Sequence, residues 1–323
     1  MSKLLFRFYA IGLLAASLAS HVGAADYPTR PIRLLVGYAA GGGTDSVARI
    51  FGQRLSEVIG QPIVIENRPG AGGNLAAQLT AQAPADGYTI HIVASSFATN
   101  PSLYSNAGYD PVNGFAPVSL VASTPYVLEV TPSLAARSVK ELIEMARAEP
   151  GKLTYASGGT GTPSHLGVEL IKSMAGIDLL HVPYKGGGQA LTDLMGGQVH
   201  AYLDPIVLAA PNVKSGRTRA LAVTSLKRSP VMPDVPTVAE SGLPGYEITG
   251  WYAIFAPVGT PADVVDILNR NIAKALESAE IRKRFLDMGL EPIGAGPEPL
   301  RQFMQTEITK WNKVIKASGA KVD

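Results

Sequence analysis

The sequence predicts an α/β protein of two lobes, each built around a mostly parallel sheet flanked by helices. Short runs of branched apolar residues alternate with helical patterns along the chain. A glycine-rich turn leads from a strand into a helix in each half of the sequence. Of the 323 residues, about 299 remain without the first 24, a length that usually divides into two domains.

Residues 1–24 have the composition of an export signal. Lys3 and Arg7 make a basic start, an apolar segment from Phe8 to Leu18 follows, and the segment ends at Val22-Gly23-Ala24. The apolar segment is too short to span a bilayer, so we expect export and cleavage near Ala24. The chain has no cysteine, which excludes a lipid anchor, disulfides and thiolate metal sites.

The charge of the chain is nearly balanced. Its formal net charge is +2, and without Lys3 and Arg7 it holds 26 basic and 26 acidic residues. Binding to nucleic acid or to an anionic membrane surface usually requires a basic face. We therefore expect no nucleic-acid partner.

The first lobe begins with three apolar runs that are typical of buried strands, at 32–36, 63–65 and 89–94. Helices are expected to begin near Asp45 and Asn74 between them. Right-handed crossovers then make the three strands parallel. Because ligands bind beyond the carboxyl ends of parallel strands, the loops at 38–44 and 95–99 are candidate ligand loops.

The loop from Tyr38 to Asp45 contains three consecutive glycines and leads into a helix that we expect to end at Gly60. The helix has one apolar stripe: Val47, Phe51, Leu55 and Val58. Thr44 is expected to be the N-cap. The free N–H groups and the positive end of the helix dipole make this loop an anion site, although a glycine-rich turn can also be a tight connection alone.

A second loop of this kind lies in the other half of the chain. A strand at 154–156 leads into the loop 157–161, and Thr162-Pro163 is the pair that typically opens a helix. The helix should end at Gly176, with Leu166, Leu170 and Met174 on one face. Two such loops predict that each lobe presents a helix N-terminus to one shared ligand.

The remaining elements set the predicted lobe boundaries. The chain should change lobe near Ser123 to Tyr126, a capping box at Ser138 to Glu141 should open a helix, and further strands are expected at 179–182, 199–203 and 220–223. An extended segment at 248–255 is expected to return the chain to the first lobe. Helices from about 260 and from about 299 to 316 then complete that lobe. We assign 1–24 to the signal, 25–125 and 250–323 to lobe 1, and 126–249 to lobe 2.

Three side chains have both a structural and a functional interpretation. Asp45 favours the helix dipole but could hold a water or a ligand amine. Asp204 ends a strand where ligand residues gather, and Asp-Pro is also a common turn. His165 lies in the first turn of the second helix and could donate a hydrogen bond either to a ligand or to the loop.

Catalytic motifs are missing from the sequence. It has no G-x-S-x-G elbow, no phosphate loop and no H-E-x-x-H zinc helix. A hydrolase using Ser95, Ser96 or Ser157 with His165 is a weaker alternative, because no acid is positioned to orient that histidine.

The chain resembles the Bug receptors, the periplasmic solute-binding proteins of tripartite tricarboxylate transporters. The resemblance covers essentially the whole mature chain and is carried by several motifs: Tyr27-Pro28-Thr29-Arg30-Pro31-Ile32, Ala39 to Asp45, Glu66-Asn67-Arg68-Pro69-Gly70-Ala71-Gly72-Gly73, Ala85-Asp86-Gly87-Tyr88-Thr89 and Pro183-Tyr184-Lys185-Gly186. It implies a periplasmic binding protein of the Venus-flytrap, type II-like fold. It also implies a periplasmic location, no catalysis, no cofactor, no metal, and delivery of a carboxylate to a membrane permease.

In this family the ligand carboxylate is expected between the two glycine loops, held largely by backbone N–H groups and ordered waters. These positions match Ala39 to Asp45 and Ser157 to Thr162, with Asp204 on the lobe 2 side. Together with the loop residues above, the predicted ligand-binding set is Tyr38, Ala40, Gly43, Thr44, Asp45, Ser95, Ser96, Thr99, Ser157, Gly158, Gly159, Thr160, Thr162, His165 and Asp204.

The sequence is compatible with more than one chemical class of carboxylate ligand. Five aromatic residues near strand ends could form the pocket wall and favour an apolar-bodied carboxylate: Tyr38, Phe97, Tyr184, Tyr202 and Trp251. An acidic side chain facing a ligand amine would favour an amino acid. We expect an organic mono- or dicarboxylate, with a permease as partner and a sensor kinase as the alternative partner.

Overall fold

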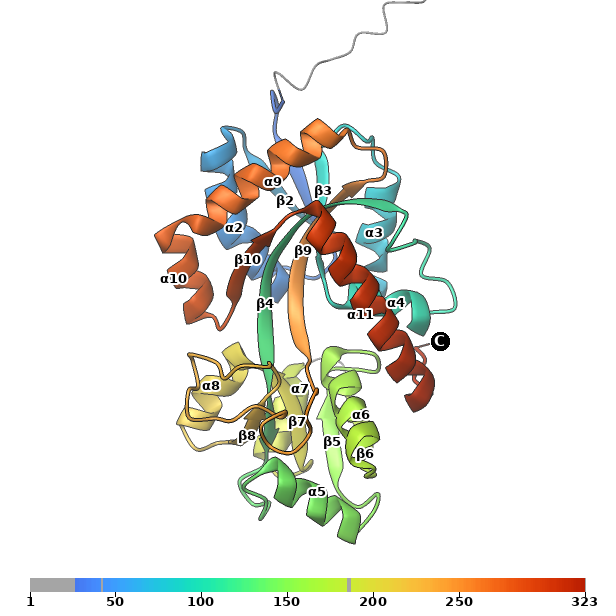
Figure 1. Cartoon of the computed structure of the whole chain (residues 1–323), viewed down its shortest axis with the longest axis vertical. Helices are drawn as coiled ribbons and strands as arrows, with labels where there is room; N and C mark the ends of the chain where they lie inside the picture. The colour runs from blue at the N-terminus through green and yellow to red at the C-terminus, as the bar shows by residue number, and fades with distance from the viewer. Residues whose placement is uncertain (1–26, 42, 185–186, 323) are drawn as a thin grey trace, which may run out of the picture.

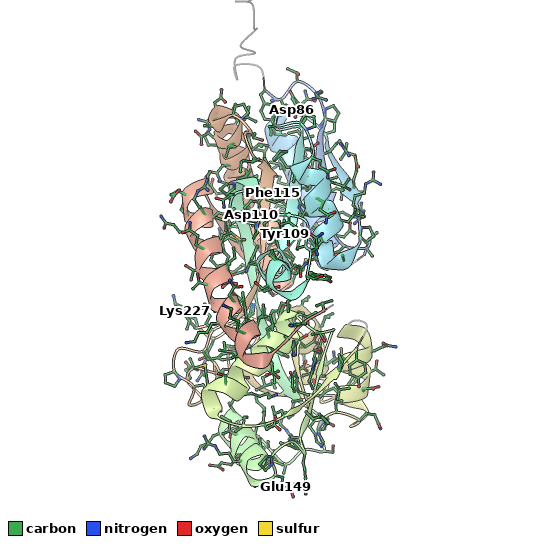
Figure 2. All side chains as sticks on the ribbon, turned by 90° about the vertical axis from the view of Figure 1, so that its right-hand side faces the viewer. Asp86, Tyr109, Asp110, Phe115, Glu149 and Lys227 are labelled. Carbon is green, nitrogen blue, oxygen red and sulfur yellow. The ribbon has the colours of Figure 1, made fainter. Side chains whose placement is uncertain are left out.

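The computed structural model describes residues 27–41, 43–184 and 187–322, which form two lobes placed end to end along the long axis (Figure 1). Figure 2 shows Asp86 at the far end of one lobe and Glu149 at the far end of the other. The predicted export signal, Gly42 of the first loop, and Lys185 and Gly186 of the resemblance motifs lie outside the described residues.

Lobe 1 holds the parallel strands that the apolar runs predicted. The strand order is β2-β1-β3-β9-β4, and β10 also pairs with β4. These strands are β1 (Ile32–Val36), β2 (Ile63–Asn67), β3 (Thr89–Ala94), β4 (Phe115–Val130), β9 (Thr249–Pro257) and β10 (Glu291–Ala295). Val36 pairs with Asn67 on β2 and with Ile92 on β3, so the carboxyl ends of the three parallel strands meet at one edge.

Helices cover both faces of the lobe 1 sheet. They are α2 (Gly43–Ile59), the short η3 (Ala71–Gly73), α3 (Asn74–Ala81), α4 (Ser96–Leu103), α9 (Ala262–Glu277), α10 (Ala279–Asp287) and α11 (Pro297–Ser318). The predicted stripe of α2 is buried at Val47, Phe51 and Leu55, and Gly60 follows the helix with φ of 77°. These residues pack in one core with Leu268 and Ile272 of α9.

Two long strands carry the chain between the lobes. β4 pairs with β9 from Phe115 to Pro125 and with β7 from Tyr126 to Val130. β4 and β9 run antiparallel to each other, and β9 also runs antiparallel to β3. The lobe 1 sheet is therefore mixed, with parallel strands on one side and β9 and β4 on the other (Figure 1). In lobe 2, β4 pairs antiparallel with both β7 and β8.

Lobe 2 repeats the strand-loop-helix pattern. Its strands are β5 (Thr154–Ser157), β6 (Leu180–Pro183), β7 (Ala201–Pro205) and β8 (Arg219–Val223), and its helices are α5 (Val139–Ala148), α6 (Pro163–Ala175), α7 (Gly187–Met195) and α8 (Ile206–Lys214). Strand β5 is parallel to both β6 and β7. The capping box is present, since the N–H of Glu141 donates to Ser138 Oγ over 3.2 Å.

Several local predictions were wrong. Helix α2 begins at Gly43, so Thr44 lies in its first turn and is not its N-cap. Met174 is 39% exposed, because α6 turns that position to solvent. Residues 96–99 are helical where we expected a loop, although Pro101 lies inside α4 and prolines usually interrupt helices.

The C-terminal helix α11 contacts both lobes, whereas the sequence placed it in lobe 1 alone. Leu300 and Met304 pack in a lobe 1 cluster with Trp251. Trp311 and Ile315 instead belong to the large buried cluster of lobe 2. The helix therefore bridges the lobes along one side (Figure 1). Within the described ranges, we find no helix whose length and apolarity would let it span a membrane.

Candidate functional site between the lobes

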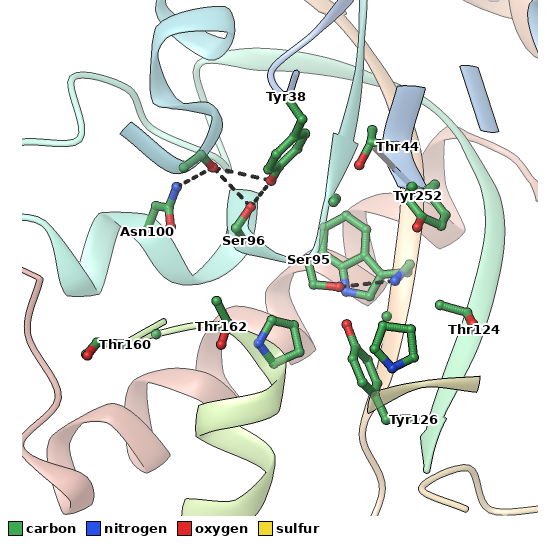
Figure 3. Close-up of a pocket in the computed structure, with 18 of the residues that line it drawn as sticks. Tyr38, Thr44, Ser95, Ser96, Asn100, Thr124, Tyr126, Thr160, Thr162 and Tyr252 are labelled. Carbon is green, nitrogen blue, oxygen red and sulfur yellow. Dashed lines mark hydrogen bonds between the residues drawn. The ribbon is translucent and has the colours of Figure 1, made fainter. Parts of the chain in front are cut away.

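A cavity of about 340 Å³ lies between the lobes at the level of the connecting strands (Figure 3). Residues from both lobes and from the C-terminal segment line it: Tyr38, Gly43, Thr44, Gly72, Ala94, Ser95, Ser96, Asn100, Tyr104, Thr124, Tyr126, Thr160, Gly161, Thr162, Pro163, Pro205, Gly250, Trp251, Tyr252 and Val322. Both glycine loops contribute to this one cavity.

The lobe 1 wall includes the start of α2. Gly43 and Thr44 form the first turn of this helix and line the cavity. The first N–H groups of a helix have no partner within the helix, and the helix dipole makes this end positive. A Cβ on Gly43 would lie 3.3 Å from the hydroxyl of Tyr252, so glycine leaves room for that tyrosine.

The lobe 2 wall is the turn before α6, and hydrogen bonds hold its shape. Thr162 is the N-cap residue, and its hydroxyl donates to the carbonyl of Gly159 over 2.6 Å. The N–H of Gly161 donates to His165 Nδ1 over 3.0 Å. Gly161 has φ of 80°, and a Cβ there would lie 2.4 Å from Leu103 of lobe 1. The two lobes therefore meet closely at this turn.

Three polar side chains of lobe 1 converge on the carbonyl of Gly72 (Figure 3). The Asn100 amide donates to it over 3.1 Å, and the hydroxyl oxygens of Tyr38 and Ser96 lie 3.3 Å and 3.2 Å from it. Tyr38 and Ser96 also hydrogen-bond each other, so one of the two hydroxyls donates to the other while the second donates to the carbonyl. Burial raises the pKa of the Tyr38 phenol, so this hydroxyl stays protonated at neutral pH. The network fixes the upper wall of the cavity in Figure 3.

The cavity is uncharged, and its exposed surface is more apolar than polar. Its lining residues include hydroxyls, one amide and backbone groups, but no Lys, Arg, His, Asp or Glu among the described residues. Within the same part of the chain, no cluster of His, Cys, Asp or Glu could hold a metal ion. An anion in this cavity would therefore be bound by neutral donors and helix N-termini.

Comparison with known proteins identifies this two-lobed arrangement. Residues 47–320 match the family described as "Tripartite tricarboxylate transporter family receptor". The chain belongs to this receptor family. The match covers most of the chain, including both lobes and the bridging helix.

Solved structures of the family share the fold over nearly the whole chain. The R. palustris protein Rpa4515, solved with adipate, is 42% identical with a TM-score of 0.82, over 92% of this chain and 100% of that one. The periplasmic binding protein BugD is 37% identical with a TM-score of 0.78, over 91% and 99%. MatC from Rhodopseudomonas palustris, solved with bound malate, is 35% identical with a TM-score of 0.75, over 90% and 100%.

In this receptor, seven residues of the predicted ligand-binding set line the cavity: Tyr38, Gly43, Thr44, Ser95, Ser96, Thr160 and Thr162. Eight do not: Ala40, Asp45, Thr99, Ser157, Gly158, Gly159, His165 and Asp204. Of the five aromatic residues proposed for the wall, Tyr38 and Trp251 line the cavity. Phe97 stacks on Tyr109 in the core of lobe 1, and Tyr202 is buried in lobe 2. Tyr184 donates to Asp193 over 2.6 Å.

Asp45 holds the first glycine loop from behind the cavity. It is 2% exposed, and its carboxylate accepts hydrogen bonds from Gly41 N, Arg49 Nε and Asn67 Nδ2 at 2.8 to 2.9 Å. The hydrogen bond from Arg49 contributes most to lowering its pKa to about 2. Ala40 lies in this loop and is exposed. The hydrogen bonds that we observe for this carboxylate therefore all stabilise the loop and the start of α2.

The second loop is supported by a stack of aromatic rings. His181 lies between Tyr155 and His165, with ring centroids 4.8 Å and 4.1 Å apart. Ser157 is fully buried and hydrogen-bonds His181 Nε2 over 2.7 Å. Burial lowers the pKa of His181 to about 4 and also lowers that of His165. Both rings are therefore neutral at pH 7, and His165 accepts a hydrogen bond where we had considered it a donor.

The remaining members of the predicted set have local roles. Gly158 N donates to Ser164 Oγ over 3.1 Å, and Thr99 Oγ1 donates to the carbonyl of Ser96 over 3.4 Å. Asp204 is fully buried just before Pro205, and neither of its carboxyl oxygens has a hydrogen-bond partner among the described residues.

The sequence-based reasoning missed several residues that line the cavity: Gly72, Asn100, Tyr104, Thr124, Tyr126, Gly250, Tyr252 and Val322. Tyr252 follows Trp251 within β9, where successive side chains alternate between faces, so its place next to Trp251 was no signal for it. No short-range signal points to Val322, which reaches the cavity only because α11 bridges the lobes.

Proposed function

We propose that this receptor captures a small organic carboxylate between its lobes in the periplasm and delivers it to the permease of a tripartite tricarboxylate transporter. The observation that carries the proposal is the convergence of the α2 and α6 N-termini on one cavity without charged side chains. Helix N-termini are ready-made anion sites because their N–H groups are free and the dipole favours negative charge.

The uncharged wall fits a protein that must release its ligand. A buried ion pair with Lys or Arg would leave a desolvated charge behind when the ligand departs, which is costly. Neutral donors hold a carboxylate through several hydrogen bonds without that penalty. Lobe closure then follows from contacts that form only when both loops reach one ligand.

The relatives support a carboxylate as the ligand class. One solved relative was crystallised with adipate and another with malate, and both are carboxylates. The export signal expected in residues 1–24 and the periplasmic relative BugD support a periplasmic location. A permease partner is inferred from the family, and no observation on this chain favours a sensor kinase.

The ligand should carry no ammonium group. Asp45 and Asp204 were the candidates for an amine partner, and neither lines the cavity. An ammonium group without a carboxylate partner would be desolvated at a large cost. The hydrolase alternative loses support because His165 does not line the cavity that Ser95 and Ser96 line. Ser157 is fully buried and hydrogen-bonds His181.

Calorimetric titration of the purified receptor tests this proposal. Butanedioate and aspartate, or hexanedioate and 2-aminohexanedioate, form matched pairs that differ by the amine. We expect binding of at least one diacid and at least about tenfold weaker binding of its amino counterpart. Failure of all mono-, di- and tricarboxylates to bind, combined with binding of sugars or metal ions, would overturn the carboxylate assignment.

A further inference from the structure

Two tyrosine hydroxyls in the cavity have no hydrogen-bond partner within the described part of the chain. They belong to Tyr126 on β4 and Tyr252 on β9, and both are drawn without a dashed line in Figure 3. Tyr38, by contrast, hydrogen-bonds Gly72 and Ser96. Hydroxyls that line a cavity and have no protein partner are available to hydrogen-bond a ligand.

The two hydroxyls lie at different places in the cavity. That of Tyr252 is 3.3 Å from the position a Cβ would take on Gly43, at the N-terminus of α2. That of Tyr126 is 3.2 Å from the corresponding position on Gly250, on the connecting strand β9. Tyr252 is therefore next to a proposed carboxylate site, whereas Tyr126 faces the connecting strands.

The structure also holds Tyr126 rigidly. Its N–H donates to Thr224 Oγ1 over 2.7 Å, and its carbonyl accepts from the N–H of Thr224 over 2.9 Å. The residue lies where β4 changes partner from β9 to β7. Gly250 has no side chain, which leaves room for the phenol to lie across β9. A ligand that hydrogen-bonds Tyr126 would therefore contact β4 at the point where this strand passes from one lobe to the other.

We propose that Tyr126 is the specificity residue for the second carboxylate of a dicarboxylate ligand, while Tyr252 serves the first carboxylate at the α2 N-terminus. This inference rests on the proposed function, because it assumes that one carboxylate occupies the helix N-termini. Burial raises the pKa of both phenols, that of Tyr252 to about 12. Both hydroxyls therefore remain protonated donors at every pH relevant to the periplasm.

The test compares Tyr126→Phe with Tyr252→Phe, because each change removes one hydroxyl and keeps the ring. Butanedioate, hexanedioate and octanedioate are titrated beside the monocarboxylates of the same chain length, with the thermal midpoint checking that each variant folds. We expect the wild type to prefer one dicarboxylate over its monocarboxylate. Tyr126→Phe should weaken that dicarboxylate at least about tenfold and change the monocarboxylate by less than about twofold.

Tyr252→Phe is the matched control, since it should weaken both members of the pair by a similar factor. Equal weakening of mono- and dicarboxylate by Tyr126→Phe, or no weakening of either, would overturn the role of Tyr126 and leave the proposed function standing. The same holds if the wild type binds the monocarboxylate as tightly as the dicarboxylate. Absence of binding by every acid would overturn both proposals.

Discussion

Asp45 and Asp204 show how strongly the surroundings of a carboxyl group change its pKa. The Asp45 carboxylate accepts hydrogen bonds from Arg49, Gly41 and Asn67, which lower its pKa to about 2. Asp204 is equally buried but has no such partners. Burial and the neighbouring carboxyl of Glu129 raise the pKa of Asp204, and burial raises that of Glu129.

The geometry explains why Asp204 and Glu129 interact. Glu129 on β4 lies opposite Tyr202 on β7, and Asp204 follows Tyr202 by two residues, so all three side chains share one face of the sheet. Thr218 donates a hydrogen bond to Glu129, but the other oxygen of Glu129 has no partner among the described residues. The pair is therefore more stable protonated than ionised.

The first prediction concerns this buried pair. The pKa of Asp204 is higher in the folded protein than in the unfolded chain, where it is near 4. The protonated carboxyl group therefore contributes its full stabilisation below the unfolded-state pKa. That contribution is lost as the pH rises from there through the folded-state pKa. Asp204→Asn removes the acid that must ionise. We compare the free energy of unfolding of this variant with that of the wild type at each pH. The difference, variant minus wild type, should be larger at pH 8 than at pH 5 by roughly 1–3 kcal/mol.

Urea unfolding at the two pH values measures this difference. Asp234 is exposed and provides the control, since Asp234→Asn should show no pH-dependent difference from the wild type beyond about 0.5 kcal/mol. A difference between Asp204→Asn and the wild type that is the same at both pH values would contradict the prediction.

At the scale of elements, the two ends of α6 are built for different purposes. Its N-terminal turn lines the cavity and depends on Gly161, whose N–H is bonded to His165 and whose φ is positive. Its C-terminal end is capped by Gly176, also with positive φ, where a Cβ would meet nothing within 4 Å. The same residue type thus serves ligand geometry at one end and helix termination at the other.

The second prediction separates these two roles. Gly161→Ala adds a Cβ in a left-handed conformation and against Leu103, so it should weaken carboxylate binding at least about tenfold and destabilise the fold by about 1 kcal/mol or more. Gly176→Ala carries the backbone strain alone. It should lower stability by about 1 kcal/mol and leave affinity unchanged.

Calorimetric titration with the ligand that the wild type binds, together with urea unfolding of both variants, measures the two effects. Equal affinities of the two variants would show that the Gly161 turn does not shape the binding site.

At the scale of the whole molecule, the lobes are joined by more than the connecting strands. The C-terminal helix α11 packs on lobe 1 near its start and on lobe 2 near its end. Beyond it, Val322 lines the cavity, and its N–H donates to the carbonyl of Leu103 over 3.0 Å. The C-terminal segment therefore closes one side of the cavity across both lobes.

The third prediction is that this segment slows ligand release. A chain ending at Gly319 lacks the Val322 contacts, so the closed form loses stabilisation and ligand dissociation should become about three- to tenfold faster. Val322→Ala keeps the backbone hydrogen bond and should have a smaller effect. Stopped-flow measurement of ligand dissociation tests this, and an unchanged rate in the shortened chain would contradict it.

The amino-acid sequence alone determined the features that depend on nearby residues. Branched apolar runs predicted the parallel strands β1 to β3, Thr162 and Gly176 marked the ends of α6, and Ser138 marked the start of α5. These features are local because a cap or a turn is satisfied within a few residues. The glycine loops and family motifs likewise indicated a two-lobed receptor before any tertiary contact was known.

Only the tertiary structure decided which side chains face the cavity. Asp45 turned toward Arg49 and Asp204 toward Glu129, while Tyr126, Tyr252 and Val322 became part of the lining. The direction of a side chain on a strand depends on register and on the partner strand, and Val322 reaches the cavity through a helix that crosses both lobes. These are long-range contacts, and a local sequence pattern carries no information about them.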